Sequence, residues 1–204
     1  MNKINYFSIV GLTSSRACSH SAKLKQVWLC TCLLAAFTAL YVVTVFATAF
    51  LGYLHPFCWV GFPVLAALLG AYSYYHMALR WPKFGAGTLL GLVFGLFLLV
   101  TGEGDVVTLG IMTAAGVVSD VVRKLTDRLA YAYPVLAIGV ISWLLPLWTR
   151  TEWYHDAAAE ELGIDYANGL MLLANWWGLL LLTAVTAFMG YLGIRLVAKC
   201  IKSK

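Results

Sequence analysis

The sequence predicts an all-α integral membrane protein with six transmembrane helices and cytoplasmic N- and C-termini. Hydrophobic residues make up 62% of the 204 residues, and charged residues only 11%. The mean hydropathy is +0.83, well above that of soluble globular proteins. A soluble core of this size could not bury so much apolar surface. Because backbone groups in lipid must pair within the chain, the spans are expected to be helices.

Six apolar runs are long enough to cross a bilayer, which takes roughly 17–25 residues. Glycine, proline and charged residues punctuate the boundaries between them. The runs together define a transmembrane domain over residues 27–204, and residues 1–26 are expected to form a loosely ordered cytoplasmic tail. The predicted spans are Val27–Leu54, Phe57–Leu79, Phe84–Thr101, Val106–Val122, Tyr131–Trp148 and Ala167–Ile194.

The basic residues predict the orientation. With the N-terminus inside, 13 of the 14 Lys and Arg residues fall in cytoplasmic segments and only Arg150 lies outside. Such an excess of cytoplasmic cations is typical of the positive-inside rule. These residues form no basic face, so no nucleic-acid partner is expected. The inside cations are Lys3, Arg16, Lys23, Lys25, Arg80, Lys83, Arg123, Lys124, Arg128, Arg195, Lys199, Lys202 and Lys204.

One polar, aromatic-rich insert, WTRTEWYHDAAAEELGIDYANGL at residues 148–170, holds five of the nine acidic residues. Ligand pockets combine aromatic walls with a few polar groups, so the external loop 149–166 is predicted to cover a small-molecule site. The other interpretation is an interfacial aromatic belt beside a solvated loop. The candidate substrate-binding residues are His55, Trp59, Trp148, Arg150, Trp153, Tyr154, His155, Asn168 and Asn175.

The candidate residues suggest the chemistry of the ligand. Asn168 and Asn175 lie seven apart in the predicted sixth span and would share a face as uncharged hydrogen-bonding groups. Aromatic residues, two outer histidines and Arg150 suit a flat, partly anionic molecule such as a haem-like tetrapyrrole or metal chelate. A vitamin-like heteroaromatic is nearly as well matched. No resident cofactor, structural metal or catalytic group is expected.

Two predicted spans carry small residues at a spacing of four, which lets helices approach closely in lipid. In the third span Gly87, Gly91 and Gly95 predict packing within the chain. In the first span Thr31, Ala35 and Ala39 form a stripe that continues through Val43 to Ala47. That stripe is consistent either with internal packing or with docking of a partner.

Three phrases in order carry a family resemblance: FTALYVV, then PVLAALLGAYSYYHMALRWPKFGAGTLLGLVFGLFLLVTG, then LLPLW followed by YANGLMLL. Together they resemble the Trep_Strep family of six-helix membrane proteins, over roughly residues 28–200. Members of this family look like substrate-binding S components of energy-coupling factor (ECF) ABC importers.

The resemblance implies a six-helix bundle in the cell membrane that holds a small molecule near its outer surface. It also implies docking on a transmembrane T component, driven by two cytoplasmic ATPase subunits, through an Ala-x-x-x-Ala stripe that Ala35 and Ala39 match. The sequence has no G-x-x-x-x-G-K-[ST] motif, so any ATPase would be a separate chain.

Other classes of protein remain open. A membrane assembly or regulatory protein would explain the small-residue stripes, although not the aromatic insert. An intramembrane enzyme would need paired carboxylates, a histidine cluster or an activated nucleophile at one depth. A pump or another type of transporter would place charges within the spans. Asp120 lies near a cytoplasmic helix end, where pairing with Arg123 or Lys124 is expected.

Overall fold

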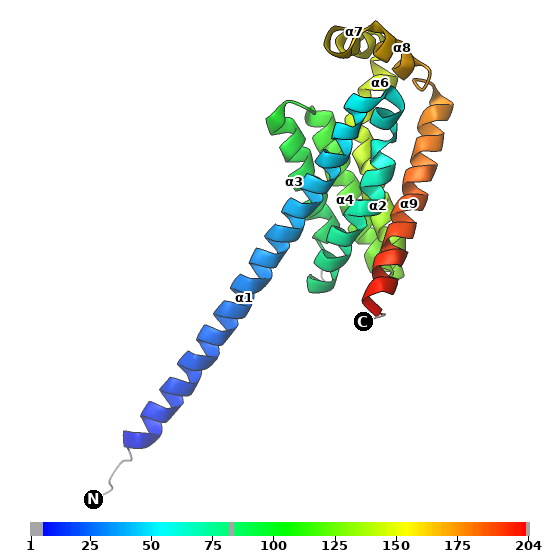
Figure 1. Cartoon of the computed structure of the whole chain (residues 1–204). Helices are drawn as coiled ribbons and strands as arrows, with labels where there is room; N and C mark the ends of the chain where they lie inside the picture. The colour runs from blue at the N-terminus through cyan, green and yellow to red at the C-terminus, as the bar shows by residue number, and fades with distance from the viewer. Residues whose placement is uncertain (1–5, 82–83, 203–204) are drawn as a thin grey trace, which may run out of the picture. The chain divides into compact units, whose positions relative to one another are not determined.

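The computed structural model describes residues 6–81 and 84–202, with side chains described for 28–81 and 84–201. All regular structure in these residues is helical (Figure 1). Lys3, Lys83 and Lys204, counted above as inside cations, lie outside the described residues. The elements are α1 (Tyr6–Ala49), η1 (Phe50–Leu54), α2 (Pro56–Arg80), α3 (Ala86–Thr101), α4 (Val106–Thr126), α5 (Leu129–Gly139), η2 (Val140–Leu144), α6 (Pro146–Thr149), α7 (Thr151–Leu162), α8 (Ile164–Met171) and α9 (Trp176–Lys202).

The chain divides into two compact units, residues 1–36 and residues 37–204. In the first unit, α1 begins at Tyr6 and runs through the segment expected to be a cytoplasmic tail. Its described side chains include the largely exposed Trp28 and Leu29. The second unit holds the end of α1 and every later helix.

Four helical segments of the described chain are long and apolar enough to cross a membrane: Trp28–Leu54, Pro56–Arg80, Val106–Thr126 and Trp176–Ile201. The predicted third and fifth spans correspond to two shorter apolar segments, Ala86–Thr101 and Leu129–Leu144. At 1.5 Å per residue, the 16 residues of α3 extend about 24 Å, less than the ~30 Å hydrocarbon core.

The predicted sixth span begins too early. Residues 164–171 form the separate helix α8, and α9 begins only at Trp176. Asn175 is the last residue of the segment that connects α8 to α9. Its Oδ1 caps α9 by accepting a hydrogen bond of 2.7 Å from the Gly178 amide. Asn168 and Asn175 therefore lie on different elements, not on one face of one helix.

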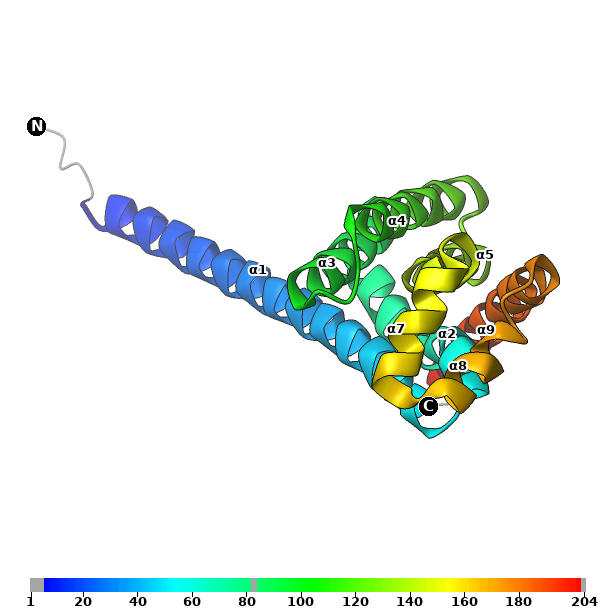
Figure 2. The same cartoon turned by 90° about the horizontal axis from the view of Figure 1, so that it is seen from above.

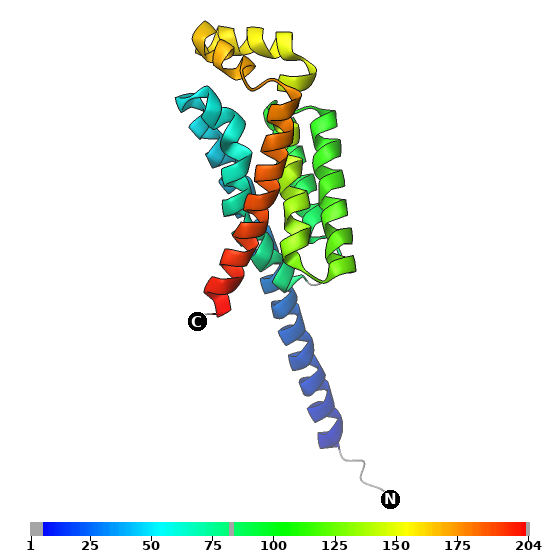
Figure 3. The same cartoon turned by 90° about the vertical axis from the view of Figure 1, so that its right-hand side faces the viewer.

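The second unit is a bundle in which α9 packs between α2 and α5, far from both in sequence. Contacts join α3 to α4, α4 to α5, α5 to α9 and α9 to α2. Figure 3 shows α7 and α8 at one end of this bundle and the C-terminus at the other. The basic residues Arg80, Arg123 and Arg195 lie near the C-terminal ends of α2, α4 and α9. Those three helices all end away from α7 (Figure 1).

The glycine stripe of α3 packs against α4, as predicted. Gly87, Gly91 and Gly95 are buried, and a Cβ added at Gly87 would lie 2.8 Å from the Gly116 carbonyl oxygen. A Cβ at Gly91 would collide with the Met112 carbonyl. The missing side chains thus allow the two backbones to approach closely, which maximises dispersion contacts.

Asp120 of α4 has a different partner from the expected arginine or lysine. Its carboxylate accepts hydrogen bonds from the amides of Gly85 at 3.1 Å, Gly87 at 2.9 Å and Thr88 at 2.8 Å. The Thr88 hydroxyl adds a fourth at 2.7 Å. Arg123 instead donates to backbone carbonyls at the end of α2. Asp120 therefore satisfies the first amides of α3, which have no partner within their own helix.

We expect Gly91→Ala to lower the free energy of unfolding by ~1–3 kcal/mol, because the added methyl group forces α3 away from α4. The matched control is Gly110→Ala in α4, where an added Cβ meets nothing within 4 Å. Thermal unfolding of the detergent-solubilised variants would compare them. Equal midpoints for both variants would contradict the close approach.

Candidate functional site

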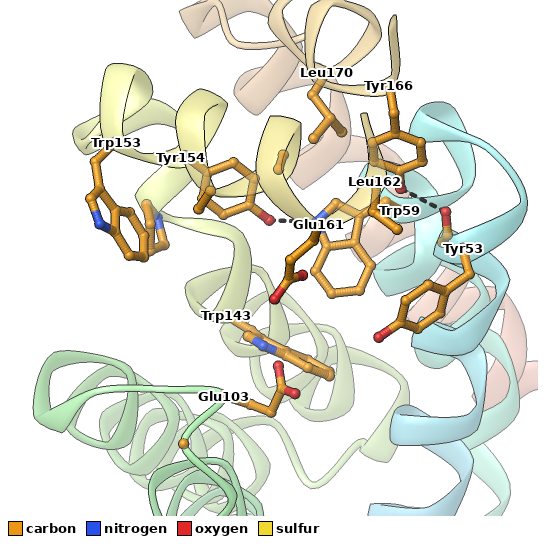
Figure 4. A pocket seen from close by; sticks show the side chains of 15 residues that line it. Tyr53, Trp59, Glu103, Trp143, Trp153, Tyr154, Glu161, Leu162, Tyr166 and Leu170 are labelled. Atoms are coloured by element: carbon orange, nitrogen blue, oxygen red, sulfur yellow. Dashed lines mark hydrogen bonds between the residues drawn. The ribbon is translucent and has the colours of Figure 1, made fainter. Parts of the chain in front are cut away.

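A cavity of about 370 Å³ lies between α7, α8 and the adjacent end of the bundle. Figure 2, seen from above, shows α7 and α8 lying across that end. The volume is within the ~300–1,000 Å³ typical of small-molecule sites. Its walls come from η1, α2, the α3–α4 connection, η2, α6, α7 and α8. Six aromatic residues line it: Tyr53, Trp59, Trp143, Trp153, Tyr154 and Tyr166 (Figure 4).

Two hydrogen bonds hold the covering helices to the bundle. Trp59 Nε1 donates to Tyr154 Oη at 2.5 Å, which joins α2 to α7. Tyr166 Oη donates to the Gly52 carbonyl at 2.6 Å, which joins α8 to η1. Gly52 is buried against Trp59, and an added Cβ would collide with the indole ring. The cover is therefore an ordered part of the fold.

The floor of the cavity is the indole of Trp143 in η2. It stacks on Phe46 with ring centroids 5.9 Å apart and meets Phe62 edge-on at 5.1 Å. Phe94 of α3 lies 6.2 Å away, also edge-on. Such aromatic pairs add stabilisation beyond their buried area. Trp143 therefore connects the cavity to the aromatic core of the bundle.

Burial is the main reason that the pKa of Tyr154 is raised, to about 12. The negative charges of Glu103 and Glu161 contribute in the same direction. Tyr154 therefore keeps its proton at neutral pH and presents an uncharged hydroxyl. Glu103 and Glu161 both line the cavity.

Three of the predicted site residues line the cavity: Trp59, Trp153 and Tyr154. Trp148 is buried in α6, and its Nε1 donates to the Asn175 carbonyl at 3.0 Å. The side chain of Asn175 caps α9 as described above.

The predicted polar anchors have protein partners outside the cavity lining. Arg150 lies 3.8 Å from Asp105, the N-cap residue of α4. His55 is exposed and caps α2, since its Nδ1 accepts from the Phe57 amide at 3.2 Å. His155 lies 3.2 Å from both Asp156 and Asn168. The guanidinium and imidazoles expected to hold a haem-like ligand thus do not line this cavity.

Five important lining residues were not predicted: Tyr53, Glu103, Trp143, Glu161 and Tyr166. For the lining residues on α7, the sequence contained a helical periodicity that could have identified them. Residues 154, 157, 158, 161 and 162 follow the spacing of one helix face, and all of them line the cavity. Treating the insert as a loop concealed this face.

No group of three or more His, Cys, Asp or Glu residues suited to a metal ion occurs where the structure describes the chain. The site instead offers aromatic faces and two carboxylates. An arrangement of this kind can bind a small molecule by stacking and electrostatic attraction.

The helices and the cavity define a helical integral membrane protein with a ligand-sized site at one end of its bundle. Residues 31–203 match the family described as "Hypothetical bacterial integral membrane protein (Trep_Strep)", and the chain belongs to this family. Neither a curated protein nor a solved structure gives a match to the chain.

The contacts of His155 generate a pH-dependent prediction. A hydrogen bond with Asp156 and a second with Asn168 raise its pKa, because both ring nitrogens face oxygen acceptors and only the imidazolium donates from both. The α7–α8 contact through His155 should therefore stabilise the fold fully below the unfolded pKa of about 6.5. The contribution should be lost as the pH rises through the folded-state pKa.

Asp156→Asn should lower the pKa of His155, measured by NMR titration of the labelled histidine ring. Glu160→Gln, on the same helix, is the control and should leave that pKa unchanged. An unaltered pKa in Asp156→Asn would contradict the assigned contact.

Proposed function

We propose that this protein is the substrate-binding subunit, or S component, of an ECF-type ABC importer in the cell membrane. It captures a small molecule in the cavity beneath α7 and α8. The observation that carries the proposal is this aromatic cavity under an ordered helical cover at one end of the bundle. A preformed concave site is typical of ligand-binding proteins.

The charge distribution supports an extracellular position for the cavity. The cavity end carries the acidic residues of the α3–α4 connection and of α7, with Arg150 as its basic residue. The opposite end carries Arg80, Arg123, Lys124 and Arg128 in the described part of the chain. Under the positive-inside rule the basic end faces the cytoplasm, so the cavity opens toward the outside.

The small-residue stripe of α1 supports docking of a partner. Ala35 and Ala39 are both exposed, whereas the glycine stripe of α3 is buried against α4. Small side chains allow a second helix to approach closely in lipid. The partners proposed are an ECF T component and two cytoplasmic ATPase subunits, because this chain has no nucleotide-binding motif of its own.

The proposal predicts that a small molecule co-purifies with the detergent-solubilised protein, at a molar ratio that mass spectrometry can measure. Trp153→Ala should reduce this ratio, with a loss of affinity of about two- to tenfold, because one aromatic wall is removed. Trp153 is 60% exposed, so the fold should tolerate the change. Trp177→Ala is the matched control, since Trp177 is 80% exposed and does not line the cavity. Equal ligand content in all three proteins would refute the site.

Docking is tested on the same preparation by co-purification of the partner subunits. We expect Ala39→Trp to reduce their yield about tenfold, since overpacking a tight contact costs ~1–3 kcal/mol. The content of bound small molecule should be retained. Leu40→Trp is the control, because Leu40 is exposed on the same helix and lies about 100° around the helix from Ala39. Wild-type partner yield with Ala39→Trp would show that the stripe does not dock.

A further inference from the structure

Two of the polar groups on the aromatic residues that line the cavity already have protein partners. The indole nitrogen of Trp59 is used by Tyr154, and the Tyr166 hydroxyl is used by the Gly52 carbonyl. These side chains also present the faces and edges of their rings to the cavity. Ring faces carry partial negative charge and attract cations.

Two carboxylates supply the formal charge of the cavity. Glu103 comes from the α3–α4 connection and Glu161 from the last turn of α7. Figure 4 shows the Glu161 side chain between Trp59 and Trp143, and the Glu103 side chain beside Trp143. No Lys, Arg or His nitrogen lies within 4.0 Å of either carboxylate among the described side chains. The described residues that line the cavity likewise include no Lys, Arg or His.

We infer that the cavity binds an organic cation with a flat apolar body, an inference that rests on the proposed substrate-binding function. The rings stack on the body of the ligand and attract its positive charge. The two carboxylates neutralise that charge. An anion of the same shape would meet two uncompensated negative charges, which selects against it.

The number of ligating groups argues against a bare metal ion as the ligand. Two carboxylates are fewer than the six to eight oxygens that Ca²⁺ takes, or the near-octahedral set that Mg²⁺ requires. The remaining walls are aromatic and aliphatic. These aromatic walls can stack on a molecule that has its own ring system, but not on a hydrated ion.

Three probes of similar shape and different charge test the inference on the purified full chain: N-methylquinolinium, neutral quinoline and 2-naphthoate. Binding is measured at pH 7.5 by quenching of tryptophan fluorescence. We expect the cation to bind most tightly and the anion least. Glu103→Gln and Glu161→Gln should each weaken cation binding about two- to fivefold, because both carboxylates are exposed and solvent screens their attraction for a cation, with quinoline binding unchanged.

The matched control is Glu160→Gln, which removes a carboxylate from α7 that does not line the cavity and should leave all three affinities unchanged. If quinoline or 2-naphthoate binds as tightly as the cation, the charge selectivity is overturned while small-molecule binding stands. If no probe binds saturably and no small molecule co-purifies, the substrate-binding function fails together with the inference. An equal loss of cation binding in Glu160→Gln would also overturn the assignment, because it would show a non-specific charge effect.

Discussion

Asp120 of α4 places its carboxylate against the start of α3, and this interaction determines how the bundle can be built. Helix α3 is shorter than a hydrocarbon core, so its first amides have to be satisfied by protein. Asp120 accepts from three of these amides and from the Thr88 hydroxyl. With that end fixed to α4, the glycine face of α3 lies along α4. The opposite end of α3 then delivers Glu103 to the cavity.

The same small-residue spacing serves two different environments in this chain. In α3 the glycines are buried against α4, while Ala35 and Ala39 of α1 are exposed. In lipid, both cases depend on van der Waals contact and not on removal of apolar surface from water. Sequence spacing therefore identifies a surface suited to close packing, and burial shows whether the chain itself has already used it.

Hydropathy located four helical segments of spanning length and two shorter apolar ones in the described chain, because span length is set by the membrane. It misplaced the start of α9, because the apolar residues Ala167 and Leu170 are buried by protein in α8, and hydropathy does not separate this burial from contact with lipid. The partner of Asp120 was missed because helix ends brought together by tertiary packing leave no local pattern. Glu103 and Glu161 lie 58 residues apart in sequence (161 − 103), so only the fold reveals that they line one cavity.

The aromatic floor closes the cavity toward the interior of the bundle. The second unit therefore holds a pocket and not a channel. Beneath Trp143, the rings of Phe62 and Phe94 have no exposed surface, and Phe94 in turn contacts the fully buried Tyr41. Closely packed interiors contain few voids larger than a water molecule. A solute held at the cavity end would reach the opposite end only if this layer of rings repacked or if the whole bundle changed its position in the membrane. In the proposed function, capture of a solute and its translocation are thus separate physical tasks.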